Sequence, residues 1–317
     1  MGYLPIRVTT LKSDIELGFD VYVKLPHKIL LYARASDDIE SYRIKYLKGK
    51  KVRKLFINDS QEAQYQSYVD RCLKSAMSDD SVSLEEKSEL VVGAGEATAE
   101  RIYEDPHSKK SYDAAQNTAT NLINALAQND EILKGIFNHT LDESDRNPDA
   151  IMQKHSLNTS SLCISFAEFM GLEKSLVEFL GVAGLFHDVA YSQSPEGEKN
   201  LFFKAVTDMD ATELTSYKVH PKIGGEILQD KDFASKEVIA LILSHEEKRG
   251  GNGFPNKLAT LTVEQEILSI CAFYDREVTC LGKTRDAVLE DFSMNQIGNY
   301  DLNVIKKFKI FVKKSGL

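Results

Sequence analysis

The sequence has no tryptophan and only four cysteines and seven prolines in 317 residues. The cysteines lie far apart and form no CxxC pair, so they indicate neither a disulfide framework nor a thiolate zinc site. Positive charge is scarce as well. The 39 basic residues face 48 acidic ones, and the net charge of −9 argues against broad binding to nucleic-acid polymers or anionic membranes.

The sequence also lacks any run of about 18 apolar residues, as a membrane-spanning helix would need. The first 19 residues do not combine a basic segment with an apolar run, as a secretory signal would. We therefore expect a soluble, cytoplasmic protein with reduced thiols.

Hydrophobic residues make up 42% of the chain, which is enough for a genuine core, and the length favours two domains. Between residues 6 and 57 the apolar residues alternate as in strands, and helical spacing follows over 60–76. We therefore predict a small α+β accessory or regulatory domain over residues 1–77. The polar segment SDDSVS at 78–83 is the predicted boundary.

After residue 84 the apolar period is close to 3.6, which predicts an all-α domain over residues 84–317. The fold class is thus mainly α. The predicted helices are 84–103, 112–141, 148–170, 172–189, 220–229, 235–244, 262–280 and 303–314.

Seven basic residues and no acidic one lie between Tyr42 and Phe56. Such a run is typical of a solvated surface, and the alternative is a contact with phosphate or with a partner. The N-terminal domain is therefore a candidate surface for protein partners.

Four of the seven histidines lie on, or directly at the end of, four different predicted helices of the second domain, at His155, His187, His220 and His245. Imidazoles from several helices are a common way to build a metal site inside a bundle. The sequence Leu-Phe-His-Asp-Val ending at Val189 is the strongest local feature, because it places an imidazole and a carboxylate in an apolar helix. Iron, manganese or zinc would satisfy both groups.

Each of these residues also has a simpler explanation. His187 and Asp188 can form a hydrogen-bonded core pair, His220 can cap a helix, and His245 can interact with a helix dipole. Asp275, at the end of another apolar helix, can face solvent.

The order of these motifs resembles the HD-GYP branch of the HD-domain metal phosphohydrolases. The resemblance covers about residues 148–285, and its specific parts are HPKIGGEIL at 220–228 and SHEEKRGGNGFP at 244–255. It implies an all-helical HD-type domain with a binuclear metal site. It also implies hydrolysis of cyclic di-GMP, with two divalent metal ions, iron or alternatively manganese, and a hydroxide that bridges them.

The resemblance also implies roles for individual residues. Asp188 would bridge the two metals, and Glu246 would orient a ligand from outside the first coordination shell. Substrate contacts would come from Tyr191, Phe254, Lys283 and Arg285. The implied metal ligands are His155, His187, Asp188, His220, His245 and Asp275.

The sequence departs from the family pattern at three positions. Tyr191 stands where the family has a lysine, Ser244 replaces one of two paired histidines, and Phe254 replaces the signature tyrosine. The first function we expect is a metal-dependent phosphodiesterase that hydrolyses or binds cyclic di-GMP or a related nucleotide. The alternative is a weak or inactive nucleotide sensor or protein-interaction module that retains its metals.

Overall fold

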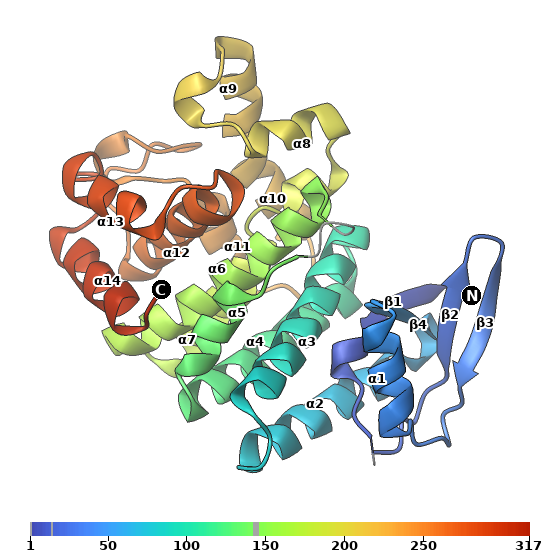
Figure 1. Ribbon diagram of the computed structural model, residues 1–317. Coiled ribbons are helices and arrows are strands. Elements are labelled where there is room, and N and C mark those ends of the chain that lie inside the picture. The colour runs from blue at the N-terminus through green and yellow to red at the C-terminus, as the bar shows by residue number, and fades with distance from the viewer. Residues whose placement is uncertain (1, 14, 142–145) are drawn as a thin grey trace. The chain divides into compact units, whose positions relative to one another are not determined.

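The computed structural model describes residues 2–13, 15–141 and 146–317, which form two compact units (Figure 1). The N-terminal unit comprises Met1–Arg101 and Asn124–His139, and the C-terminal unit comprises Ile102–Ile123 and Thr140–Leu317. Residues 84–101 and 124–139 thus group with the N-terminal unit, whereas the sequence assigns them to the helical domain. The predicted boundary at 78–83 stays a prediction.

The strands and first helices of the N-terminal unit are β1 (Tyr3–Arg7), β2 (Val21–Leu25), β3 (Lys28–Ala33), α1 (Ser41–Gly49), β4 (Lys54–Asn58) and α2 (Glu62–Ser78). The strands form an antiparallel sheet in the order β1-β4-β2-β3. In the two pairings that β4 makes, Ile6 lies opposite Leu55 and Val21 opposite Ile57, and all four residues are buried.

Aromatic side chains connect α2 to the segment that follows β1. The ring of Phe19 packs edge-on against Tyr65 and Tyr68, at centroid distances of 5.5 and 5.3 Å. The Tyr68 hydroxyl also accepts a hydrogen bond from the Lys12 backbone N–H at 2.8 Å. Buried tyrosines need such a partner for the hydroxyl, and these contacts satisfy it.

The basic run at 43–54 falls on α1, on the turn that follows it and on the first residue of β4, and acidic residues of α3 (Leu84–Glu104) neutralise part of it. Lys48 pairs with Glu89 at 2.6 Å and Lys54 pairs with Glu100 at 2.7 Å. These ion pairs give the run a structural explanation within its own unit.

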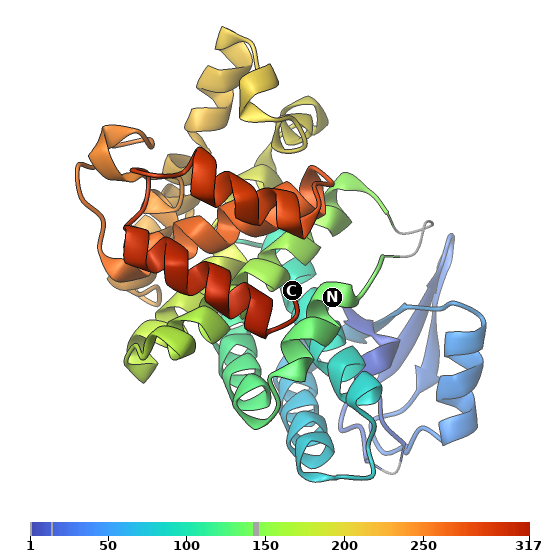
Figure 2. The same ribbon diagram turned by 60° about the vertical axis from the view of Figure 1, so that its left-hand side comes forward.

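The C-terminal unit is built almost entirely of helices. Its helices are α6 (Pro148–Met170), α7 (Lys174–Phe186), α8 (Glu196–Phe202), α9 (Ala211–Lys218), α10 (His220–Gln229), α11 (Lys236–Ser244), α12 (Val263–Asp275), α13 (Arg285–Met294) and α14 (Leu302–Lys314). α4 (Lys109–Gln128) has residues in both units, and α5 (Glu131–Asn138) belongs to the N-terminal unit. α6 packs against α7 and α12, and α11 packs against α7, α10 and α12. α13 and α14, the red helices in Figure 2, pack against each other, and α14 also contacts α6 and α12.

The central helix α6 has the bounds that the sequence predicts, because both of its ends carry strong local signals. The Asn147 side chain accepts a hydrogen bond from the Ala150 N–H, and Pro148 occupies the first helical turn. Gly171 ends the helix with φ of +78°, a conformation that glycine adopts without strain.

The mainly α fold class is confirmed, with a small sheet near the N-terminus and a helical remainder. The predicted helix 112–141 is two helices, because the chain turns at Asn129 and Asp130. The apolar periodicity does not predict α8, α9 and α13, because these helices are short and polar. No helix among the described residues is long and apolar enough to cross a membrane.

Candidate metal centre

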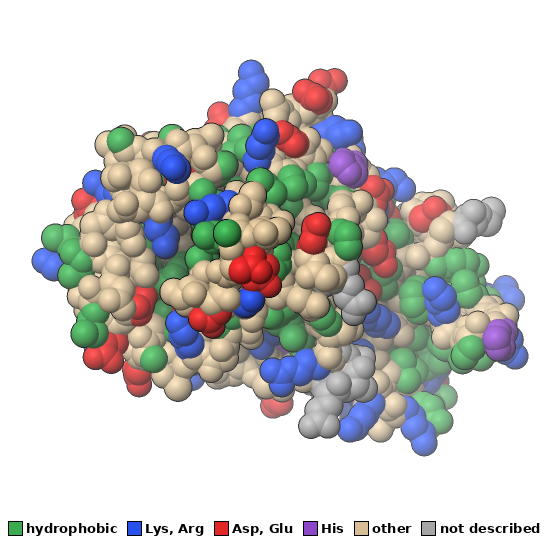
Figure 3. Space-filling view, turned by 90° about the horizontal axis from the view of Figure 1, so that it is seen from above, with side chains coloured by type: hydrophobic (Ala, Val, Ile, Leu, Met, Phe, Trp, Pro, Cys, Tyr) green, Lys and Arg blue, Asp and Glu red, His purple; other side chains and the backbone are tan. Residues whose placement is uncertain are grey.

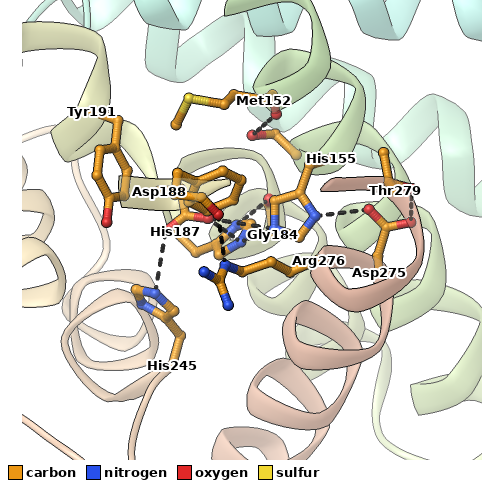
Figure 4. A network of polar contacts seen from close by, with 12 residues as sticks. Met152, His155, Gly184, His187, Asp188, Tyr191, His245, Asp275, Arg276 and Thr279 are labelled. Carbon is orange, nitrogen blue, oxygen red and sulfur yellow. Dashed lines mark hydrogen bonds and ion pairs between the residues drawn. The ribbon is translucent and has the colours of Figure 1, made fainter. Parts of the chain in front are cut away.

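Four buried imidazoles surround the buried carboxylate of Asp188 in the C-terminal unit. Figure 4 labels three of them, His155, His187 and His245. Asp188 Oδ2 lies 3.1 Å from His187 Nε2 and 3.4 Å from His155 Nε2. Asp188 Oδ1 lies 3.3 Å from His220 Nε2 and 3.5 Å from His245 Nε2. The carboxylate therefore offers one oxygen to each of two imidazole pairs.

The ends of helices supply most of these side chains. His187 and Asp188 directly follow α7, His220 begins α10, and His245 directly follows α11, whereas His155 comes from within α6. Side chains at the ends of helices extend past the surfaces where the helices pack against each other. Side chains from several helices can therefore meet at one site.

Backbone carbonyls fix the orientation of three imidazoles. His187 Nδ1 donates to Gly184 O at 2.9 Å, and His245 Nδ1 donates to Ile242 O at 2.7 Å. His220 Nδ1 donates to Tyr217 O at 2.6 Å. Because Nδ1 carries the proton, each neutral imidazole directs the Nε2 lone pair at the centre of the cluster.

The fourth imidazole is oriented by Asp275. The carboxylate accepts the His155 Nδ1 proton at 2.7 Å, and its other oxygen accepts hydrogen bonds from Asn158 Nδ2 at 2.9 Å and Thr279 Oγ1 at 2.8 Å. Asp275 thus lies on the far side of the His155 ring from Asp188. Carboxylates commonly hold metal-binding histidines in this way.

The donor set fits divalent metal ions. His155, His187 and Asp188 form one group whose ligand atoms lie within 4.8 Å of one another, and Asp188, His220 and His245 form a second. His220 Nε2 and His245 Nε2 approach to 2.9 Å, where two neutral lone pairs would repel each other. A cation between them removes that conflict, and imidazole with carboxylate suits iron, manganese or zinc.

The electrostatics of the cluster favour an ionised carboxylate. Burial opposes ionisation, but the surrounding imidazoles outweigh it and hold the pKa of Asp188 well below its usual range. Burial lowers the pKa of His220 to about 4, against the opposing field of Asp188. Metal binding needs the carboxylate ionised and the imidazoles neutral, and Asp188 and His220 meet this requirement. Burial opposes protonation of His155, but Asp188 and Asp275 outweigh it and raise its pKa to about 9, so a metal ion would displace a proton there.

A cavity of about 500 Å³ opens over the cluster, within the range of small-molecule sites. His155, His187, Asp188 and His245 contribute to its wall. Four cations also line it: Lys218, Lys248, Arg276 and Lys283. Beyond the cavity, basic and acidic side chains are interspersed on the face seen in Figure 3, so positive charge is not spread over this surface.

The residues predicted to contact substrate fall into two groups. Phe254 and Lys283 line the cavity, where the Phe254 ring packs edge-on against Tyr217 at 5.7 Å and Lys283 pairs with Glu277. Tyr191 and Arg285 are not among the described residues of the cavity wall. Tyr191 is buried, and its ring lies 5.2 Å from that of His220. The substrate contacts of these residues stay predictions.

Glu246 lines the cavity and accepts the Tyr217 hydroxyl proton at 2.6 Å. Since the Tyr217 carbonyl accepts from His220, Glu246 is linked to a candidate ligand through that tyrosine. This placement is compatible with the predicted orienting role, which stays a prediction.

Glu247 was not singled out from the sequence, although it is fully buried. Its carboxylate accepts backbone N–H groups from Asn256 at 2.5 Å and from Lys257 and Leu258 at 3.0 Å each. It therefore fixes the loop that carries Phe254 into the cavity.

Comparisons with known proteins agree with this geometry. A family model described as an HD domain matches residues 138–285. Bd1817, an HDG"Y"P protein from Bdellovibrio bacteriovorus, is similar in structure with a TM-score of 0.73 and 26% identity, over 98% of this chain and 100% of that chain. These matches support membership of the chain in the HD-GYP family. Within that family the chain would be unconventional, since Phe254 stands where the signature has tyrosine.

Two further matches cover a smaller part of this chain than Bd1817 does. The cyclic di-GMP phosphodiesterase PA4108 of Pseudomonas aeruginosa is 31% identical over 123 residues, which are 38% of this chain and 29% of that protein. The HD domain of L. monocytogenes phosphodiesterase PgpH in complex with cyclic di-AMP is 16% identical with a TM-score of 0.37, over 51% of this chain and 87% of that chain.

Proposed function

We propose that this protein is a metal-dependent phosphodiesterase of the HD-GYP type that hydrolyses cyclic di-GMP. The observation that carries the proposal is the pair of His/Asp groups that share Asp188 at the floor of a cavity lined by four cations. Bound divalent ions lower the pKa of water and neutralise charge on a phosphodiester. The similarity to a cyclic di-GMP phosphodiesterase supports the choice of substrate.

The protein's own residues have distinct parts in this proposal. Asp188 holds both metals, and His155, His187, His220 and His245 complete the two sites. Asp275 either joins the ligands or, as its hydrogen bond to His155 Nδ1 favours, keeps that imidazole oriented. Two ions are proposed, iron or alternatively manganese.

The cavity wall would hold the nucleotide. The ammonium groups of Lys218, Lys248 and Lys283 can approach phosphate oxygens, and the Phe254 ring offers an apolar face to a base. The volume of the cavity suits a ligand of nucleotide size.

The test is a hydrolysis assay on metal-loaded protein. Protein loaded with Fe²⁺ or Mn²⁺ is incubated with cyclic di-GMP, and the linear dinucleotide and GMP are separated by chromatography. We expect product from the wild type and from His107→Ala, whose imidazole is exposed and outside the cluster, and none from His245→Ala. Equal turnover by the two variants would refute the assignment.

Tyr191 favours a second candidate function, nucleotide sensing without hydrolysis. It carries no charge at the position where the family has a lysine, and it lies behind His220 rather than in the described cavity wall. Binding of cyclic di-GMP by metal-loaded protein with no product would favour the sensor over the enzyme.

A further inference from the structure

Arg276 is a buried arginine beside the metal centre that the sequence analysis did not single out. It follows Asp275 at the end of α12 and begins a π-helical turn, Arg276–Cys280. Such turns are rare, and they occur frequently at functional sites because they redirect side chains. In the close-up the guanidinium is drawn beside the histidine cluster, and Arg276 and Asp188 line the same cavity (Figure 4).

The partners of the Arg276 guanidinium are neutral. Nε donates to the Phe202 carbonyl at 3.1 Å and Nη2 donates to the Lys204 carbonyl at 2.8 Å. The rings of Phe202 and Tyr217 lie 5.3 and 5.1 Å from the guanidinium carbon. Among the described residues, no carboxylate lies within ion-pair distance.

Glu246 of the same cavity wall acts on this charge electrostatically, but it forms no ion pair with the guanidinium, and its carboxylate accepts a hydrogen bond from the Tyr217 hydroxyl. Arg276 is only 7% exposed, and a buried charge without a directly paired opposite charge is unfavourable. The two carbonyls use two of the five N–H groups that a guanidinium carries, which leaves three for a ligand. An anion in the cavity would supply a directly bonded negative charge.

The other cations of the cavity already have partners of their own. Lys283 pairs with Glu277, the Lys248 ammonium lies 5.3 Å from the Phe273 ring, and the Lys218 ammonium lies 6.0 Å from the Phe254 ring. Of the four, Arg276 is the most buried and the most firmly anchored to the backbone.

We infer that Arg276 binds a non-bridging phosphate oxygen of the nucleotide through the N–H groups that the backbone carbonyls leave free. This inference rests on the proposed function, since it names the residue that holds the phosphodiester at that site. The carbonyls of Phe202 and Lys204 fix the guanidinium, so its donors are oriented before the ligand arrives. Bidentate pairing of this kind suits arginine better than lysine.

The test compares Arg276→Met, which removes the charge, with the matched control Arg249→Met. Arg249 pairs with Glu266 and is not among the described cavity residues. Binding of cyclic di-GMP to metal-loaded protein is measured by calorimetry under conditions that suppress turnover. Inorganic phosphate serves as a second probe that carries no base. Metal content is measured on each sample.

We expect Arg276→Met to weaken both probes by about 10- to 100-fold, as the loss of one charge-assisted hydrogen-bonding group does. Metal content should stay at the wild-type value, and Arg249→Met should bind as the wild type does. Arg276→Lys should recover part of the affinity. If Arg276→Met does not fold, Arg276→Lys takes its place in the comparison.

Several results would overturn the inference. Unchanged affinity in Arg276→Met, an equal loss in Arg249→Met, or loss of metal would each assign Arg276 a structural role only. A loss for the dinucleotide with no change for inorganic phosphate would place the contact elsewhere on the nucleotide. If wild-type protein binds phosphate but not cyclic di-GMP, the proposed substrate is wrong, and this inference falls with it.

Discussion

A single added methyl group at Gly184 should open one of the two proposed metal sites. Gly184 lies in the last turn of α7, and an added Cβ would lie 2.6 Å from Ser160 Cα and 2.8 Å from Ser160 N of α6. The shorter distance is 0.8 Å below the 3.4 Å at which ordinary contact begins. Since both atoms belong to the backbone, α7 has to move away from α6.

The magnitude follows from two opposing effects. Overpacking of this kind costs about 1–3 kcal/mol, and replacing a helical glycine by alanine returns up to about 1 kcal/mol. We expect Gly184→Ala to lose about 1–2 kcal/mol of stability, and Tm to fall by about 2–8 °C for a domain of this size.

Gly184→Ala should affect metal binding at the two proposed sites unequally. His155 lies on α6, whereas His187 and Asp188 follow α7, so separation of the two helices lengthens the distances within that group. The group formed by Asp188, His220 and His245 contains no residue of α6. Metal content should therefore fall from two towards one per chain.

The assay is calorimetric unfolding together with elemental analysis, and Gly197→Ala is the matched control. Gly197 lies in α8 with nothing within 4 Å of an added Cβ, so this variant should keep both metals and the wild-type Tm or a slightly higher one. Unchanged Tm and metal content in Gly184→Ala would refute the packing argument.

Two other perturbations test the supporting structure. Glu247→Gln should speed hydrogen exchange at the amides of residues 256–258, because one of its two accepting oxygens is lost; unchanged protection would contradict this. In the N-terminal unit, burial opposes ionisation of Glu96, but His139 and Arg7 outweigh it and lower the pKa to about 2. The ionised Glu96 carboxylate therefore stabilises the folded state fully above pH 4.5, and this contribution is lost as the pH falls towards 2. Urea unfolding should show up to about 3 kcal/mol less stability, and Glu96→Gln should abolish this dependence. An identical acid profile in the variant would refute the assignment.

Part of the histidine cluster carries local signals in the sequence. His187 with Asp188 interrupts an apolar helix, and His220 precedes a proline at a helix start. These signals place His187, Asp188 and His220 at helix ends, whereas His155 lies within α6 and has no such signal. The family resemblance then supplies the order of the motifs.

The remaining features depend on contacts between distant segments, which spacing along the chain does not encode. Arg276 is fixed by carbonyls more than 70 positions away, so its sequence neighbourhood shows only a base after Asp275. The alternation of apolar residues likewise does not reveal that Tyr191 packs behind His220. The one sequence signal that could have pointed to Arg276 is its position as a charged residue at the end of an apolar helix.

The central claim is that Asp188 serves two metal ions at once, and metal content per chain tests it most directly. Protein purified without chelator, or reconstituted with Fe²⁺ or Mn²⁺, is analysed for metal as the wild type and as Asp188→Ala. The structure predicts two ions per chain in the wild type and loss of both in Asp188→Ala, because both ligand groups contain this carboxylate. Two ions retained by Asp188→Ala, or no metal in the wild type, would contradict it.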